Sequence, residues 1–178
     1  MNSLIESIKM IMQQKGIQPR KAVEISAIKD AESKLQITFP SEYVKFLTEV
    51  GDGWDRYFNN NHWYPEMKSF RTVIDDNEFL AKEFLYTEPW IWEDNDTNPL
   101  PNESDEEWNQ RVDRLLLPVQ YGNIALICTG DGGSLNLILT GNERGNMWFF
   151  SDIGIFPCYA PNTFLKFVES WLTGKQIY

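Results

Sequence analysis

Acidic and aromatic side chains occur together in residues 75–107, and this combination of residue types could bind and hydrolyse a sugar. The stretch contains twelve acidic residues and one basic residue, Lys82, and it includes Trp90 and Trp92. Glycosidases place two carboxyl groups on either side of the bond to be broken and stack aromatic rings on the sugar. Acidic residues this frequent form pairs by chance, and no spacing here fixes two of them in opposed positions. A glycan-acting enzyme is therefore the less favoured interpretation.

Other residue types that perform catalysis or bind metals are few. The chain has one histidine, His62, and we expect it to make a hydrogen bond in a loop rather than to act as a base. Residues 93–96 offer several oxygen atoms to a calcium ion but lack the glycine and glutamate spacing of an EF-hand. Residues 130–133 are glycine-rich but join two expected strands, so they lack the helix N-terminus of a phosphate site. We expect no catalytic residue, no metal and no cofactor.

A protein partner is the ligand that the acidic stretch favours. Its net charge is −11, whereas the residues before it sum to +1 and those after it to zero. This asymmetry argues against nucleic acid or an anionic membrane as a direct partner, and it is compatible with a basic protein. Surface tryptophans among such residues are typical of a protein-binding hot spot. The predicted partner-binding residues are Asp75, Asp76, Trp90, Trp92, Glu93, Asp94, Asp96, Glu106 and Glu107.

Two alternatives stay open at this point. The acidic stretch can equally be a solvated loop and helix face. The aromatic residues between Trp54 and Tyr64 either anchor their own loop or expose rings for contact, and they are the second candidate surface.

The strands that must position these residues are expected between residues 122 and 157. Residues 134–140 alternate apolar and polar side chains, with Leu135, Leu137 and Leu139 on one face, which is the pattern of a strand with one buried side. Glycine-rich turns separate this run from two further strands, at 124–128 and 146–151. The sequence therefore predicts an α+β fold with an antiparallel meander covered by helices.

Helices are expected wherever apolar residues recur at spacings of three and four after a capping residue. Trp171 lies on the apolar phase of the last helix and Trp148 on a strand, so we expect both in the core. Residues 53–65 match neither period and are expected to be a loop. The expected helices start from Ser3, Ser26, Ser41, Ser69, Ser104 and Asn162 or Thr163. Two of these starts have the sequence of a capping box, Ser3 with Glu6 and Ser104 with Glu107.

One domain over residues 1–178 is expected from the length, with an acidic surface excursion at about 87–105. No apolar run is long enough to span a membrane, and the first ten residues do not resemble a signal peptide. Cys128 and Cys158 form no metal-binding spacing, so we expect two free buried thiols and a cytoplasmic protein.

Three blocks of the sequence resemble the SUKH superfamily, which groups the Smi/Knr cell-wall regulators with bacterial immunity proteins. The first is LILTGNERGNMW at 137–148, followed by the helix TFLKFVESWL at 163–172. The second is ISAIKDAESKLQITFPSEYVKFLTEVGDGW at 25–54, and the third is FLYTEPWIWEDND at 84–96. Along the chain these blocks occur in the same order as in the family, and together they span well over half of the chain.

The resemblance implies a binding module rather than an enzyme. Bacterial members are typically immunity proteins that neutralise a toxin, and fungal relatives are signalling hubs for cell-wall synthesis. We therefore expect an immunity protein that holds a basic toxin domain. The alternative is an intracellular scaffold or regulator of cell-wall synthesis signalling. The family has no catalytic motif, and its binding surfaces vary, so no contact residue is carried over.

Overall fold

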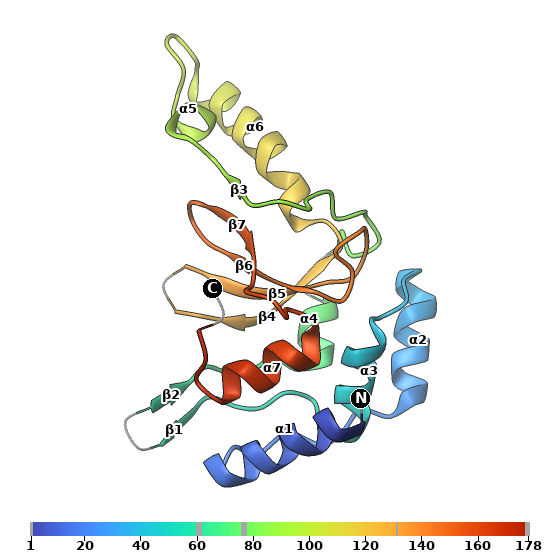
Figure 1. Ribbon diagram of the computed structural model, residues 1–178. Coiled ribbons are helices and arrows are strands. Elements are labelled where there is room, and N and C mark those ends of the chain that lie inside the picture. Colours follow the sequence, from blue (N-terminus) through green and yellow to red (C-terminus); the bar gives the residue numbers. More distant parts are fainter. Residues whose placement is uncertain (1, 60–61, 76–77, 131, 177–178) are drawn as a thin grey trace.

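The computed structural model describes residues 2–59, 62–75, 78–130 and 132–176, and it has the α+β architecture expected from the sequence (Figure 1). The helices are α1 (Asn2–Lys15), α2 (Ile25–Leu35), α3 (Ser41–Glu49), α4 (Phe70–Asp75), α5 (Asp94–Thr97), α6 (Asp105–Leu116), the 3-10 helix η1 (Leu117–Gln120) and α7 (Phe164–Leu172). The strands are β1 (Tyr57–Asn59), β2 (His62–Tyr64), β3 (Trp90–Ile91), β4 (Asn123–Cys128), β5 (Ser134–Ile138), β6 (Met147–Phe150) and β7 (Gly154–Pro157).

The central sheet has five strands in the order β3-β7-β6-β5-β4, and all neighbours are antiparallel. The predicted meander is thus confirmed, with β7 added at its end and β3 added as an edge strand. Alternation along the strands separates two buried faces. Leu137 and Met147 belong to the larger core, and their neighbours Ile138 and Trp148 belong to a smaller cluster on the opposite face.

The larger core lies where α7 covers one face of the sheet, with α1 packed against α7 on the far side (Figure 1). Phe164 and Phe167 of α7 are fully buried there. The indole ring of Trp171 stacks on that of Trp54 at a centroid distance of 5.4 Å, and Trp54 is itself fully buried. We expected both Trp148 and Trp171 in the core. Trp148 has no exposed surface, whereas Trp171 is half-buried against the larger core.

The smaller cluster packs against the segment from Phe84 to Trp92, which leads into the edge strand β3. Phe84 and Trp148 pack edge to face at 5.1 Å, and Ile138 and Ile155 complete the buried set. Tyr86, Trp90 and Trp92 pack against this set while staying half-buried. This face of the sheet is therefore covered mainly by an extended segment, with Val119 of η1 packed beside it.

The expectation of a loop over residues 53–65 was wrong. Tyr57 pairs with Tyr64 and Phe58 with Trp63 in a β-hairpin. Each strand has only three residues, which is too short for a period to be recognised, although aromatic residues favour strands. Trp54 and Tyr64 are buried, so these two rings anchor the segment, and Phe58 is exposed.

The sequence predicts helix from Ser69 to Phe84 with a break around residues 75–77; the structure has a helix over Phe70–Asp75, residues 76–77 lie outside the described ones, and residues 78–84 are not helical. Beyond the helix, a residue just after β5 binds the backbone: Thr140 Oγ1 donates to the carbonyl of Lys82 at 2.7 Å and accepts from the N–H of Phe84 at 3.0 Å. These backbone groups therefore have tertiary partners in place of helical ones. Gly122 N donates to the carbonyl of Phe79 at 3.1 Å in the same way.

Three smaller expectations were also corrected. The second helix starts at Ile25 with Glu24 at its N-cap position and no side-chain cap, so Ser26 lies inside it. Ser3 likewise lies inside α1. The thiol of Cys128 is free but exposed, because this residue is the last of β4. Cys158 is free and buried, as expected.

Candidate protein-binding surface

Residues 88–116, here called the acidic arm, leave the sheet through β3 and return to it through α6. The arm contains nine acidic residues and two arginines, so it carries −7 of the chain's net charge of −10. Figure 1 shows α5 and α6 extending beyond the sheet, on the side where β3 forms its edge. No residue of α6 is buried.

Strand pairing and a backbone hydrogen bond join the base of the arm to the sheet. Trp90 pairs with Ile155 and Ile91 with Gly154. The backbone N–H of Trp92 donates to the carbonyl of Ile153 at 3.2 Å.

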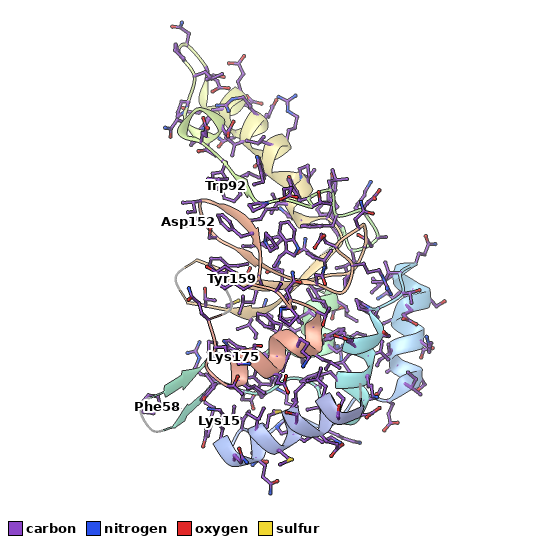
Figure 2. The ribbon with its side chains drawn as sticks, viewed as in Figure 1. Lys15, Phe58, Trp92, Asp152, Tyr159 and Lys175 are labelled. Atoms are coloured by element: carbon purple, nitrogen blue, oxygen red, sulfur yellow. The ribbon has the colours of Figure 1, made fainter. Side chains whose placement is uncertain are left out.

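The two tryptophans predicted to bind a partner are part of this junction. Trp92 Nε1 donates to the carbonyl of Asp152 at 2.7 Å, and Figure 2 shows Trp92 next to the β6–β7 turn that carries Asp152. The ring of Trp90 is stacked on Tyr86 at 5.3 Å and meets Trp92 edge to face at 5.4 Å. Both indoles are half-buried, so much of their surface is used to attach the arm.

Arg111 braces the arm internally. Its guanidinium donates to both carboxylate oxygens of Glu103, at 2.8 and 3.0 Å, and also to the carbonyls of Asp96 and Asn98, at 2.5 and 2.7 Å. The bonds from Arg111, together with the N–H of Leu100, lower the pKa of Glu103 to about 2. One arginine thus connects α6 to the α5 turn and to the loop between them.

Two of the predicted contact carboxylates have local structural partners. Glu107 completes the predicted capping box: its carboxylate accepts from the Ser104 N–H at 3.0 Å, and its own N–H donates to Ser104 Oγ at 3.3 Å. These bonds lower the pKa of Glu107. Asp96 Oδ2 accepts from the N–H of Glu93 at 2.8 Å. Asp96 and Glu107 therefore shape the arm.

The remaining predicted residues divide between the arm and other places. Glu93 and Glu106 have exposed side chains on the arm, and Asp94 begins α5 there. Asp75 lies on α4, which packs against β4, and its carboxylate is 3.8 Å from Arg71. Asp76 lies outside the described residues. The structure thus groups seven of the nine predicted residues on one projecting element and leaves Asp75 apart.

An apolar groove at the base of the arm was not expected from the sequence. It has a volume of about 620 Å³. Phe149 and Phe156 pair across β6 and β7 and line it. Cys158 lies against it, and burial raises the pKa of this thiol to about 12. The complete lining is Pro89, Phe149, Phe156, Pro157, Cys158, Tyr159, Ala160 and Asn162.

From the sequence, alternation along the strand assigns Phe149 to the sheet face that α7 covers, but it does not reveal a groove there. The groove exists because α7 begins at Phe164 and leaves this part of the face open, and helix placement is a tertiary property. Tyr159 and Ile91 are exposed at 58% and 55%, so the groove opens to solvent beside β3.

The described residues contain no group of three or more His, Cys, Asp or Glu side chains arranged for a metal ion. His62 lies in β2 by its backbone. None of the helices in the described ranges is both long and apolar enough to cross a membrane.

A family model described as SUKH_6, SMI1-KNR4 cell-wall, matches residues 25–167 of the chain. All three sequence blocks that resemble the SUKH superfamily lie within this range or run a few residues past its end. Neither the curated proteins nor the solved structures gave a match.

Proposed function

This chain belongs to the SUKH_6 family of SMI1-KNR4 cell-wall proteins, and we propose that it is a non-catalytic binding module of the immunity type, which holds a basic toxin domain through its acidic arm. Family membership fits a binding module. The immunity role, the toxin partner and the choice of surface belong to the proposal.

The observation that carries the proposal is the separation of the arm from the core. Seven of the ten net negative charges lie on residues 88–116, and α6 carries no buried residue. Helix α6 thus adds no buried residue to the core, whereas a concentrated negative potential on a projecting element accelerates encounter with a basic partner.

A regulator of cell-wall synthesis signalling is the second candidate, because the description of the matching family names the cell wall. The same arm would then bind a resident basic protein. The two candidates differ in what happens without the chain: a toxin partner stops growth when expressed alone, and a resident partner does not.

The test is co-expression with the product of each gene adjacent to this one. We expect one product to arrest growth alone, to be neutralised by the chain and to co-purify with it at equal stoichiometry. A bound product that is harmless alone would favour the regulator. If no adjacent product binds, the immunity role is contradicted.

The arm is tested by reversing Glu93 and Glu106 to Lys, since Asp96 and Glu107 support local structure. At low salt the association rate should fall about tenfold, and the difference should shrink at high salt because exposed charges are screened. The control reverses two exposed residues, Glu24 at the N-cap of α2 and Asp30 within α2, to Lys. This gives the same change in net charge. An equal effect of both pairs would contradict the arm as the binding surface.

A further inference from the structure

We propose that the apolar groove at the base of the acidic arm receives an apolar, preferably aromatic, side chain of the basic partner, while the arm carboxylates bind Lys or Arg residues next to it. This inference rests on the proposed function and adds the chemistry by which the partner is recognised.

The groove has the size and lining of a binding pocket. A volume of about 620 Å³ lies within the range of pockets that hold small molecules or side chains, which are mostly apolar with few polar groups. The sheet supplies Phe149 and Phe156, which are half-buried. Asn162 is the lining residue with a side-chain amide. An aromatic or large aliphatic group would displace water from this surface and gain hydrophobic free energy.

The groove is continuous with the arm. Pro89 lines it and belongs to the arm. Ile91 pairs with Gly154, so its side chain lies on the same sheet face as Phe156 and extends the apolar surface along β3. Glu88, next to Pro89, and Glu93, two residues beyond Ile91, are both exposed.

Charge complementarity therefore selects the occupant. An apolar side chain with acidic neighbours would be repelled by the arm, whereas one flanked by Lys or Arg gains from both surfaces. An anchor in a dry pocket surrounded by charged rim contacts is the usual arrangement of a protein-binding hot spot.

The experiment titrates the isotope-labelled full chain with short peptides and follows backbone amide NMR signals. The probes are a lysine-rich peptide with one central tryptophan, the same peptide with alanine in its place, and a glutamate-rich peptide with the tryptophan. We expect the tryptophan–lysine peptide to shift the amides of Ala160 and Asn162 and to bind about tenfold more tightly than the alanine peptide.

Two matched variants locate the effect. Tyr159→Ser removes an exposed aromatic ring that lines the groove, and Phe58→Ser removes an equally exposed ring, at 58% and 59% respectively, on the distant β1–β2 hairpin (Figure 2). Tyr159→Ser should abolish the advantage of tryptophan over alanine, and Phe58→Ser should leave it unchanged.

The outcomes separate this inference from the proposed function. If the two lysine peptides bind equally and shift only arm amides, the groove is overturned while the acidic binding surface stands. If the glutamate and lysine peptides with tryptophan bind the groove equally, charge selection by the arm is overturned. Equal losses in Tyr159→Ser and Phe58→Ser would also overturn the groove assignment.

Discussion

At the scale of single residues, Tyr43 buries a polar hydroxyl group inside the larger core. Its ring is 1% exposed and packs edge to face on Phe164 at 5.2 Å. Its hydroxyl has no hydrogen-bond partner in the described part of the chain, and burial, with a contribution from Asp52, raises the pKa of this phenol far above its ordinary value.

Tyr43→Phe should therefore stabilise the protein. Removing a buried hydroxyl without a partner recovers its desolvation penalty, and the expected gain in the free energy of unfolding is about 1 kcal/mol. Urea denaturation would measure the gain from the shift in midpoint at constant slope. A loss of stability would show that the hydroxyl has a partner in solution.

Trp148→Ala should cost about 3–5 kcal/mol of unfolding free energy, because the truncation leaves a cavity in a fully enclosed site. The indole has no exposed surface and packs on Phe84 at 5.1 Å. Trp171→Ala should cost less, since this ring is only half-buried. The same denaturation experiment compares them, and equal costs would contradict this ranking of the two sites.

At the scale of elements, the arm depends on two sets of contacts that can be broken separately, one inside the arm and one between the arm and the sheet. The first is the bracing of Glu103 by Arg111, which lowers the pKa of this carboxyl from 4.5 to about 2. A carboxyl whose pKa is lower in the folded state contributes stability above its unfolded pKa and loses it as pH falls through the folded value. The arm should therefore keep its order above pH 4.5 and lose it towards pH 2.

Carboxyl NMR titration of Glu103 measures this directly. The midpoint should be about 2 in the native chain, and Arg111→Gln should raise it towards 4.5, the ordinary value of a glutamate. Glu107, whose pKa is lowered by Ser104 rather than by Arg111, is the internal control and should titrate as before. An unchanged midpoint for Glu103 in Arg111→Gln would contradict the bracing.

The second set of contacts, between the arm and the sheet, includes the close approach of β3 to Gly154. A Cβ atom on this residue would lie 2.4 Å from the carbonyl oxygen of Trp90 and 3.0 Å from the Cα of Ile91. Gly154→Val should therefore displace β3 while β4, β5 and β6 stay paired. Amide hydrogen exchange should become faster in residues 88–116, and unchanged exchange there would show that β3 tolerates the side chain.

The elements also show what the sequence could and could not predict. The capping box at Ser104 was recognisable because its partners lie three residues apart. The expectation of helix beyond the break at residues 75–77 was wrong, because Thr140, two residues after β5, binds the backbone around Lys82 and Phe84, and sequence periodicity carries no information on such distant partners. The acidic arm was visible as charge and the apolar groove was not, because the groove depends on where α7 begins.

At the scale of the whole molecule, the chain divides into a body with a large core and an arm with almost none. The single domain over residues 1–178 stays a prediction, and the arm is the region where cooperativity with the body is weakest. Segments with few buried apolar contacts open locally at lower free energy than core strands. In α6 no residue is buried, whereas β5 has four buried residues out of five.

Native-state hydrogen exchange over a series of urea concentrations should therefore give two classes of amide. Amides of β4, β5 and β6 should exchange only through global unfolding, whereas those of α5 and α6 should exchange through an opening at least about 2 kcal/mol lower in free energy, or roughly thirtyfold more often. Adding the tryptophan–lysine peptide should slow exchange in both classes, because a ligand that binds only the closed arm raises the free energy of the local opening and that of global unfolding by the same amount. If arm and sheet exchange at one common free energy, the arm is an integral part of the cooperative fold, and its charges cannot be assigned to a partner on the ground that the core does not need them.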